Sequence, residues 1–151
     1  MLTFRRAQRD DVRAIVALLA DDPLGRSRES ATPELEPGYL HAFEAIDRDA
    51  NQLLLVADDD GVVVGCLQLT FIPGLSRRGM WRGLLEGVRV ASTRRNVGLG
   101  SAMVRHAIEL CRQRGCGLLE LASDKSRTDA QRFYKSLGFI ASHEGMKLSL
   151  K

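Results

Sequence analysis

The sequence predicts a mixed α+β domain with a central, mostly antiparallel sheet flanked by helices. Residues 52 to 72 form two apolar, β-branched runs around an Asp-Gly turn, which is a strong hairpin signal. Residues 81 to 90 read as a further strand, in which Gly87 breaks the pattern where a bulge fits. An amphipathic helix over 98 to 114 then leads to a short buried strand at 117 to 123. This crossover predicts one parallel pair inside the mixed sheet.

The N-terminal part adds one strand and two helices. Residues 2 to 6 alternate apolar and polar side chains and are expected to form a strand. Asp10 and Asp11 then introduce apolar residues at helical spacing, and acidic side chains suit the first turn of a helix. Residues 21 to 38 contain three of the four prolines and little periodicity, so we expect a long loop before a short helix over 39 to 46.

The C-terminal part is expected to contain one helix and two short strands. Ser126 and Asp129 have the spacing of a capping box, and the residues that follow predict a helix that ends at Gly138. Short apolar segments at 139 to 141 and 146 to 150 are predicted to be the closing strands of the chain.

Size and charge limit the classes of protein to consider. The 151 residues suit a single domain, 1–151. The chain has 22 basic and 19 acidic residues, and the arginines are scattered along it. No zinc-finger spacing or basic arm is present, so no nucleic-acid partner is expected. No segment approaches the ~18 apolar residues of a membrane span and the N-terminus lacks an apolar signal core, so we expect a cytoplasmic protein without membrane contact.

The cysteines and histidines do not indicate a metal site. The three cysteines lack metal-type clustering, and Cys66 and Cys111 fall on apolar positions, so they are expected to be reduced and buried. His41, His106 and His143 are widely separated in the sequence, and no metal is expected.

The stretch TRRNVGLGSAM, residues 93 to 103, places two glycines at the start of a predicted helix. Glycine in a helix costs roughly 0.5 to 1 kcal/mol relative to alanine, so Gly98 and Gly100 indicate that something approaches the backbone closely. A helix start offers unpaired N–H groups and the positive end of its dipole, and Arg94 or Arg95 would add charge. A pyrophosphate is the natural ligand. The alternative is a turn that only changes the direction of the chain.

Two other phosphate-binding motifs fit less well. A Walker-type loop needs a lysine before its final serine or threonine, whereas this turn has Gly100 directly before Ser101. A dinucleotide fingerprint needs a third glycine where this sequence has Met103. Glu120 lies at a plausible distance to meet a ribose, but the preceding antiparallel hairpin argues against repeated βαβ units.

The segment Arg95 to Gly100 resembles the R/Q-x-x-G-x-G/A signature of the GNAT superfamily of N-acetyltransferases, whose turn holds the coenzyme A pyrophosphate. LLEGVRV before the turn, LLELAS after its helix and RFYKSLGF at 132 to 139 agree with the family in order and distance. The detailed match covers about residues 82 to 139 and implies the GNAT acyl-CoA N-acyltransferase fold. One departure is Arg127, where many members have an asparagine.

The resemblance implies an enzyme that transfers an acetyl group from acetyl-CoA to a primary amine by direct attack. An alkyl ammonium has a pKa near ~10.4, so a base should remove its proton, directly or through water. Glu86 matches the family's carboxylate position; the alternative is an outward-facing glutamate paired with an arginine. Tyr134 matches the tyrosine that protonates or hydrogen-bonds the departing sulfur, and its phenol is protonated at neutral pH. The alternative for Tyr134 is core packing beside Phe133.

By the same resemblance, the end of the strand before the turn should pair with the pantetheine arm, with an amide near Val88 polarising the thioester carbonyl. Arg89 and Arg94 could instead be ordinary surface arginines. The residues expected to bind the cofactor are Val88, Arg89, Val90, Arg95, Asn96, Val97, Gly98, Leu99, Gly100 and Ser101.

The acceptor is expected to be a small-molecule amine or a peptide. Acidic residues outnumber basic ones in the loop at 21 to 40, which favours a cationic amine. Dimers are common in the resembled family, so a homodimer is compatible with the resemblance. Two alternatives stay open: a noncatalytic acyl-CoA-binding module of the same fold, and a nucleotide-binding domain that prefers NAD or ATP.

Overall fold

The computed structural model describes residues 1 to 151, which separate into two compact units. The first unit is Met1–Glu120 and the second is Leu121–Lys151, and each is described by itself. The sheet has the strand order β1-β2-β3-β4-β5, and β1 to β4 pair antiparallel. Its strands are β1 (Leu2–Arg6), β2 (Gln52–Asp59), β3 (Val62–Ile72), β4 (Arg82–Val90) and β5 (Leu118–Leu121).

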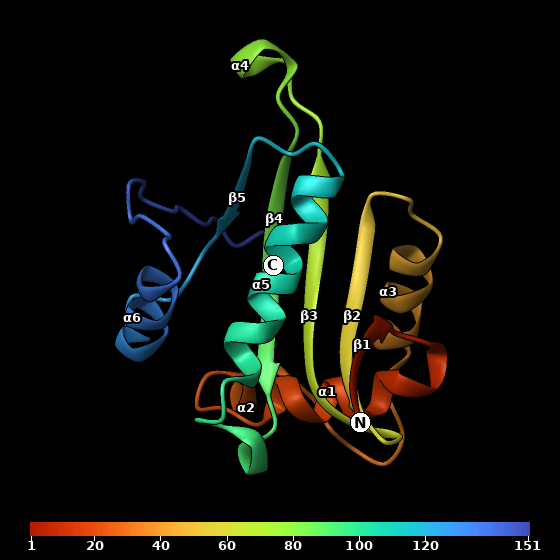
Figure 1. The fold of residues 1–151 in the computed structure, drawn as a ribbon. Coiled ribbons are helices and arrows are strands. Elements are labelled where there is room, and N and C mark those ends of the chain that lie inside the picture. Colours follow the sequence, from red (N-terminus) through yellow and green to blue (C-terminus); the bar gives the residue numbers. More distant parts are fainter. The chain divides into compact units, whose positions relative to one another are not determined.

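Five helices belong to the first unit, and Figure 1 shows α5 lying across β3 and β4 while α3 lies beside β2. Helix α5 connects β4 to its neighbour β5, as expected for the crossover. Two short 3₁₀ turns precede α1 and follow β4, at Arg9–Asp11 and Ser92–Arg94. The helices are α1 (Val12–Ala20), α2 (Gly25–Arg28), α3 (Pro37–Asp47), α4 (Ser76–Gly79) and α5 (Leu99–Gln113).

The predicted hairpin is confirmed. Strands β2 and β3 are joined by Asp60 and Gly61, whose φ values of 50° and 90° are both left-handed, as a two-residue hairpin turn requires. The Gly61 N–H also donates to Asp58 Oδ1 at 2.7 Å, which fixes the turn.

The two faces of the sheet pack against different helices. Toward α5, Leu67 and Leu69 are fully buried together with Met103 of the helix. A Cβ at Gly65 would lie 2.6 Å from the Met103 sulfur, so the glycine allows the helix to approach the sheet closely. On the opposite face, a second apolar cluster joins sheet residues to α1 and α3: Ala7, Val12, Ile15, Val16, Leu18, Phe43, Val56 and Cys66.

Helix α5 ends at Gln113, within one residue of the predicted end at 114, and a left-handed glycine follows its C-cap. Gly115 has φ 79°, and its N–H donates to the Arg112 carbonyl at 3.0 Å while the Cys116 N–H donates to the Cys111 carbonyl at 2.9 Å. This pair of bonds is a Schellman motif. Cys66 and Cys111 are buried and unbridged, as predicted, and burial raises the pKa of each thiol to about 12.

The second unit contains α6 (Thr128–Ser136), and two sequence predictions fail there. Ser126 does not cap the helix, because it lies one residue before the N-cap position and its hydroxyl donates to Asp124 Oδ1 at 2.7 Å. The segments 139 to 141 and 146 to 150 form no strand. Their alternating apolar pattern would need a pairing strand, and instead Ile140, Met146 and Leu148 are exposed.

A charged cluster joins β1 to the start of α1. The Arg5 guanidinium donates to both carboxylate oxygens of Asp11 at 2.7 and 3.0 Å and to Asp58 Oδ2 at 2.9 Å. Asp11 Oδ2 also accepts the Gln8 N–H at 2.7 Å, which caps the turn before α1. These hydrogen bonds, chiefly those from Arg5, hold the pKa of Asp11 below its ordinary value.

We therefore predict that Asp11→Asn lowers the free energy of unfolding by about 1 kcal/mol at pH 7, because charge-assisted hydrogen bonds are lost. A depressed folded-state pKa contributes stability above the unfolded-state pKa of about 3.9, and this stability is lost as pH falls through the folded-state pKa. Urea denaturation below about pH 5 should thus show a shallower pH dependence for Asp11→Asn. Asp10→Asn, an exposed neighbour, is the control; equal slopes for both variants would contradict the prediction.

Candidate active site

Strand β4 carries the predicted bulge at Gly87. Glu86 lies opposite Gln68 and Arg89 lies opposite Cys66, so β4 has one more residue than β3 between these two pairs. Gly87 adopts a left-handed φ of 61°, which favours glycine. Because side chains alternate along a strand, the extra residue brings Arg89 to the same face of the sheet as Glu86.

Glu86 presents an unpaired carboxylate on that face. Its side chain is exposed and makes no hydrogen bond or ion pair within the protein. The alternative of a strand glutamate held by an arginine is therefore not the arrangement found. This exposed carboxylate lies opposite the half-buried side chain of Gln68, and it can accept a proton or bind an ammonium group.

The Arg89 side chain is directed at the segment between α1 and α2. Its Nε lies 2.8 Å from Asp22 Oδ2, and the two side chains are 21% and 11% exposed. The N–H is not aligned for a hydrogen bond, so this contact is an ion pair. Asp22 Oδ1 accepts the N–H groups of Leu24 and Gly25 at 2.9 and 2.7 Å. Arg89 is therefore no ordinary surface arginine, because it ties the α1–α2 segment to β4.

The glycine turn forms the N-terminus of α5. Gly98 is the N-cap residue with φ 83°, and Asn96 is also left-handed with φ 64°. No side chain caps the helix, and its first turn contains no acidic residue. A Cβ at Gly98 would meet no atom within 4 Å, so the backbone conformation rather than lack of space requires the glycine. This donor set of uncapped N–H groups fits a phosphate group.

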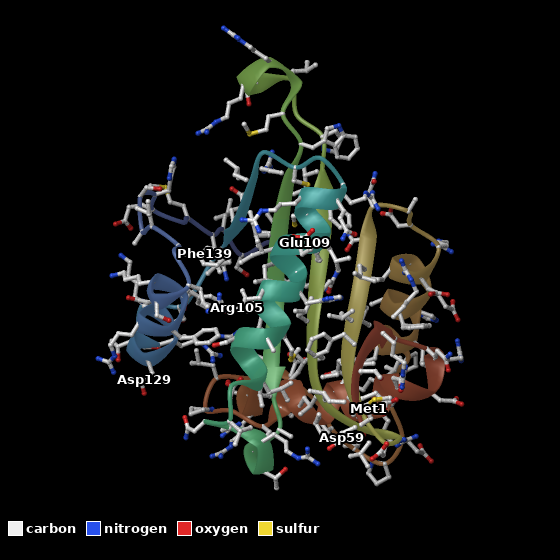
Figure 2. All side chains as sticks on the ribbon, viewed as in Figure 1. Met1, Asp59, Arg105, Glu109, Asp129 and Phe139 are labelled. Carbon is white, nitrogen blue, oxygen red and sulfur yellow. The ribbon has the colours of Figure 1, made fainter.

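The two arginines before the turn differ in their surroundings. Arg94 Nη1 lies 2.5 Å from Asp59 Oδ2, and Asp59 Oδ1 lies 3.5 Å from the N-terminal amine, with Met1 and Asp59 labelled in Figure 2. Arg95 Nη2 donates to the Asp21 carbonyl at 3.2 Å and lies 3.7 Å from its carboxylate, with both side chains about half exposed. Arg94 therefore anchors the turn, whereas Arg95 is accessible to an anion.

Tyr134 lies on α6 in the second unit. Its ring contacts Phe133 and Phe139 edge-on, at centroid distances of 5.0 and 5.6 Å. The side chain is half-buried, and the Tyr134 carbonyl accepts the N–H groups of Leu137 and Phe139. The ring is thus fixed by aromatic packing within its own unit, and its role as an acid stays a prediction.

Sequence reasoning missed a row of polar side chains on the Glu86 face of β2 and β3. Gln52 Oε1 accepts hydrogen bonds from Gln68 Nε2 and Thr70 Oγ1, both at 3.0 Å. The signal in the sequence was the period of two between Gln68 and Thr70 in an otherwise apolar strand.

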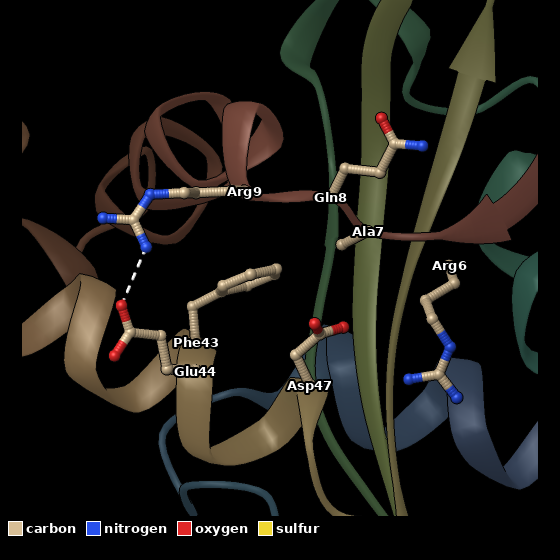
Figure 3. A pocket seen from close by; sticks show the side chains of 7 residues that line it. All are labelled: Arg6, Ala7, Gln8, Arg9, Phe43, Glu44 and Asp47. Carbon is tan, nitrogen blue, oxygen red and sulfur yellow. Dashed lines mark hydrogen bonds and ion pairs between the residues drawn. The ribbon is translucent and has the colours of Figure 1, made fainter.

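A cavity of about 430 Å³ lies elsewhere, between the end of β1 and α3 (Figure 3). An ion pair of 2.8 Å between Arg9 and Glu44 borders it, and none of the predicted site residues lines it. The residues around it are Arg6, Ala7, Gln8, Arg9, Phe43, Glu44 and Asp47. No group of three or more His, Cys, Asp or Glu side chains is placed to hold a metal ion. No helix is both long and apolar enough to cross a bilayer.

One known family has a bulged strand, an uncapped glycine turn and a helix with an aromatic pair in the same order along the chain as β4, the start of α5 and α6 here. The family model for the acetyltransferase (GNAT) family matches residues 13–139. The chain belongs to the GNAT family. The mixed α+β fold with a mostly antiparallel sheet agrees with this membership and confirms the fold class expected from the sequence.

Three proteins similar to this GNAT chain are described as two N-acetyltransferases of different acceptors and one transcriptional regulator. The glucosamine 6-phosphate N-acetyltransferase of Trypanosoma brucei brucei is 34% identical over 90 residues, covering 60% of this chain and 59% of that enzyme. The aminoalkylphosphonate N-acetyltransferase of Salmonella typhimurium is 30% identical over 140 residues, covering 92% and 85%. A solved structure of a Bacillus halodurans transcriptional regulator has a TM-score of 0.96 and 47% identity, covering 99% and 100%. The match thus spans less than two thirds of the trypanosome enzyme.

The Arg89–Asp22 ion pair yields a stability prediction. Arg89→Met should lower the free energy of unfolding by about 2 kcal/mol or more, because it removes the Arg89 charge from the largely buried Asp22 carboxylate. Asp22→Asn combined with Arg89→Met should recover part of that loss, since the asparagine keeps an Oδ1 acceptor for Leu24 and Gly25. Thermal and urea denaturation measure both effects. Arg105→Met, at an exposed position labelled in Figure 2, is the control. Additive effects of the two changes would contradict a coupled pair.

Proposed function

We propose that this chain is an acetyl-CoA-dependent N-acetyltransferase that acetylates a primary amine of a small molecule or peptide by direct attack, as a single catalytic domain over 1–151. One observation carries the proposal: the strand with the unpaired Glu86 carboxylate leads, through a bulge, into a helix start that no side chain caps. Membership of the GNAT family supports it. A cytoplasmic location and a homodimer remain part of the proposal.

Acetyl-CoA supplies an acetyl thioester whose carbonyl carbon an amine can attack. The N–H groups of the first α5 turn and the accessible Arg95 would hold its phosphates, and the backbone of Val88, Arg89 and Val90 would pair with its pantetheine arm. The Val88 amide would donate to the carbonyl oxygen. The remaining residues proposed for the phosphate turn are Asn96, Val97, Gly98, Leu99, Gly100 and Ser101.

Glu86 and Tyr134 would move the protons. An alkyl ammonium is protonated at neutral pH, so the Glu86 carboxylate takes its proton, directly or through water, before or during attack. The Tyr134 hydroxyl donates a proton or a hydrogen bond to the departing sulfur. Since both named enzymes among the relatives act on small amines, the small-molecule acceptor is favoured over the peptide.

A noncatalytic acyl-CoA-binding module is the second candidate. The observation that favours it is the 47% identity with a protein known as a transcriptional regulator. Such a module would bind acetyl-CoA through the same turn without releasing coenzyme A thiol.

Calorimetric titration tests cofactor binding. We expect selective binding of acetyl-CoA over NAD and ATP, and a roughly 10-fold weaker affinity in Gly98→Ala, because an alanine at φ 83° is strained and shifts the turn. Gly38→Ala is the matched control, because this glycine lies in α3 with no atom near its added Cβ. Equal or tighter binding of NAD or ATP would instead support a nucleotide-binding domain.

Thiol release tests the chemistry. Glu86→Gln and Tyr134→Phe should each lower kcat by about 100-fold while the dissociation constant for acetyl-CoA changes little, since a positioned acid or base contributes 10²- to 10⁴-fold. The Glu86→Gln defect should shrink as pH rises toward ~10, because the amine loses its own proton. Glu109→Gln, exposed on α5 (Figure 2), is the control. Binding of acetyl-CoA without turnover of any amine would favour the noncatalytic module.

A further inference from the structure

Gln52, Gln68 and Thr70 form a continuous polar row beside Glu86. Gln52 pairs in register with Thr70, and Gln68 pairs in register with Glu86. These polar side chains therefore share one face of the sheet on three neighbouring strands. All three members of the row are half-buried, while the same strands otherwise supply the two apolar clusters.

The hydrogen bonds within the row fix the orientation of its groups. Gln52 Oε1 accepts from both neighbours, whereas the Gln52 amide nitrogen and the Gln68 carbonyl oxygen make no hydrogen bond within the protein. A half-buried amide without a partner is unfavourable unless water or a ligand completes its hydrogen bonding. The row therefore offers neutral donors and acceptors to a molecule bound next to Glu86.

The charges on this face of β4 select against a phosphate group. Arg82, on the same face as Glu86, has its Nε 2.7 Å from Glu120 Oε1, and Arg89 is paired with Asp22. The unpaired charge beside the row is thus the negative charge of Glu86. An ammonium group is attracted to it, whereas a phosphate would meet this carboxylate and would have to compete with Glu120 for Arg82 and with Asp22 for Arg89.

We propose that the row Gln52–Gln68–Thr70 is the acceptor subsite and that it selects an unphosphorylated, hydroxyl-bearing primary amine of amino-sugar size. This inference rests on the proposed acetyltransferase function. The ammonium group lies at Glu86, and hydroxyl groups bond first to Gln68 and then to Gln52 or Thr70. Neighbouring strands are about 4.8 Å apart and Gln52 is also offset from Glu86 by two residues along the strands, so their backbones lie roughly 12 Å apart. A ring that carries several hydroxyl groups therefore reaches more of the row from Glu86 than a short amino alcohol does.

The test compares kcat/KM for three amines, measured by release of coenzyme A thiol: glucosamine, glucosamine 6-phosphate and cyclohexylamine. We expect glucosamine to exceed cyclohexylamine by about 10-fold or more when both are compared toward pH ~10, where the two amines are largely neutral, because a site built to bond hydroxyl groups discriminates against analogues that lack them. Glucosamine should also exceed its 6-phosphate. Gln68→Leu should lower kcat/KM for glucosamine about 10-fold and leave that for cyclohexylamine within about 3-fold.

Two controls separate recognition from folding. Gln113→Leu, exposed at the end of α5, should leave the preference intact. Thermal melting of Gln68→Leu shows whether the row only stabilises the sheet: a lower Tm with an unchanged glucosamine preference would overturn the subsite. A preference for glucosamine 6-phosphate, or equal turnover of glucosamine and cyclohexylamine, would overturn the proposed selectivity while the enzyme assignment stands. No thiol release with any amine, in protein that binds acetyl-CoA, would overturn the proposed function and this inference with it.

Discussion

The extra residue at Gly87 is the constraint on which the arrangement around β4 depends. In a regular strand, residues three apart point to opposite faces, so Glu86 and Arg89 would be separated by the sheet. The bulge places them on one face, opposite Gln68 and Cys66 respectively. A Cβ at Gly87 would lie 3.6 Å from Leu19 Cδ2, which is ordinary contact, so it is the left-handed φ that calls for glycine.

Once Arg89 is on this face, it fixes the segment that follows α1. Asp22 Oδ2 forms an ion pair with Arg89, and Asp22 Oδ1 accepts hydrogen bonds from the N–H groups of Leu24 and Gly25. A Cβ at Gly25 would lie 1.9 Å from the Leu19 carbonyl oxygen, so the chain there is packed too tightly for any other residue. The bulge, the ion pair and this tight turn therefore act together to hold the α1–α2 segment beside Glu86.

Features of the site that depend on neighbouring residues could be predicted from the sequence, and those that depend on distant pairing could not. The Gly87 bulge and the Gly98 turn are local, because a glycine in an apolar run or at a helix start weakens that element and so indicates a special backbone conformation. The Asp22–Arg89 pair joins positions far apart in the chain, and the polar row appears only when Gln52 pairs with Thr70. The Ser126 prediction failed through local competition, since Asp124 takes the hydroxyl that the capping box requires.

The arginines around the turn show how one segment can be both fixed and available to a ligand. Arg89 is mostly buried against Asp22, and Arg94 is held 2.5 Å from Asp59, so both pairs are closer and less exposed than that of Arg95. The Arg95–Asp21 contact is longer and half exposed, and such surface pairs contribute only about 0 to 1 kcal/mol. A phosphate group that accepts two N–H bonds from one guanidinium interacts more strongly than this. An anion can therefore displace Asp21 from Arg95 at little cost, while Arg89 and Arg94 keep the strand and the turn in place. Glu86 then keeps its position when the anion binds.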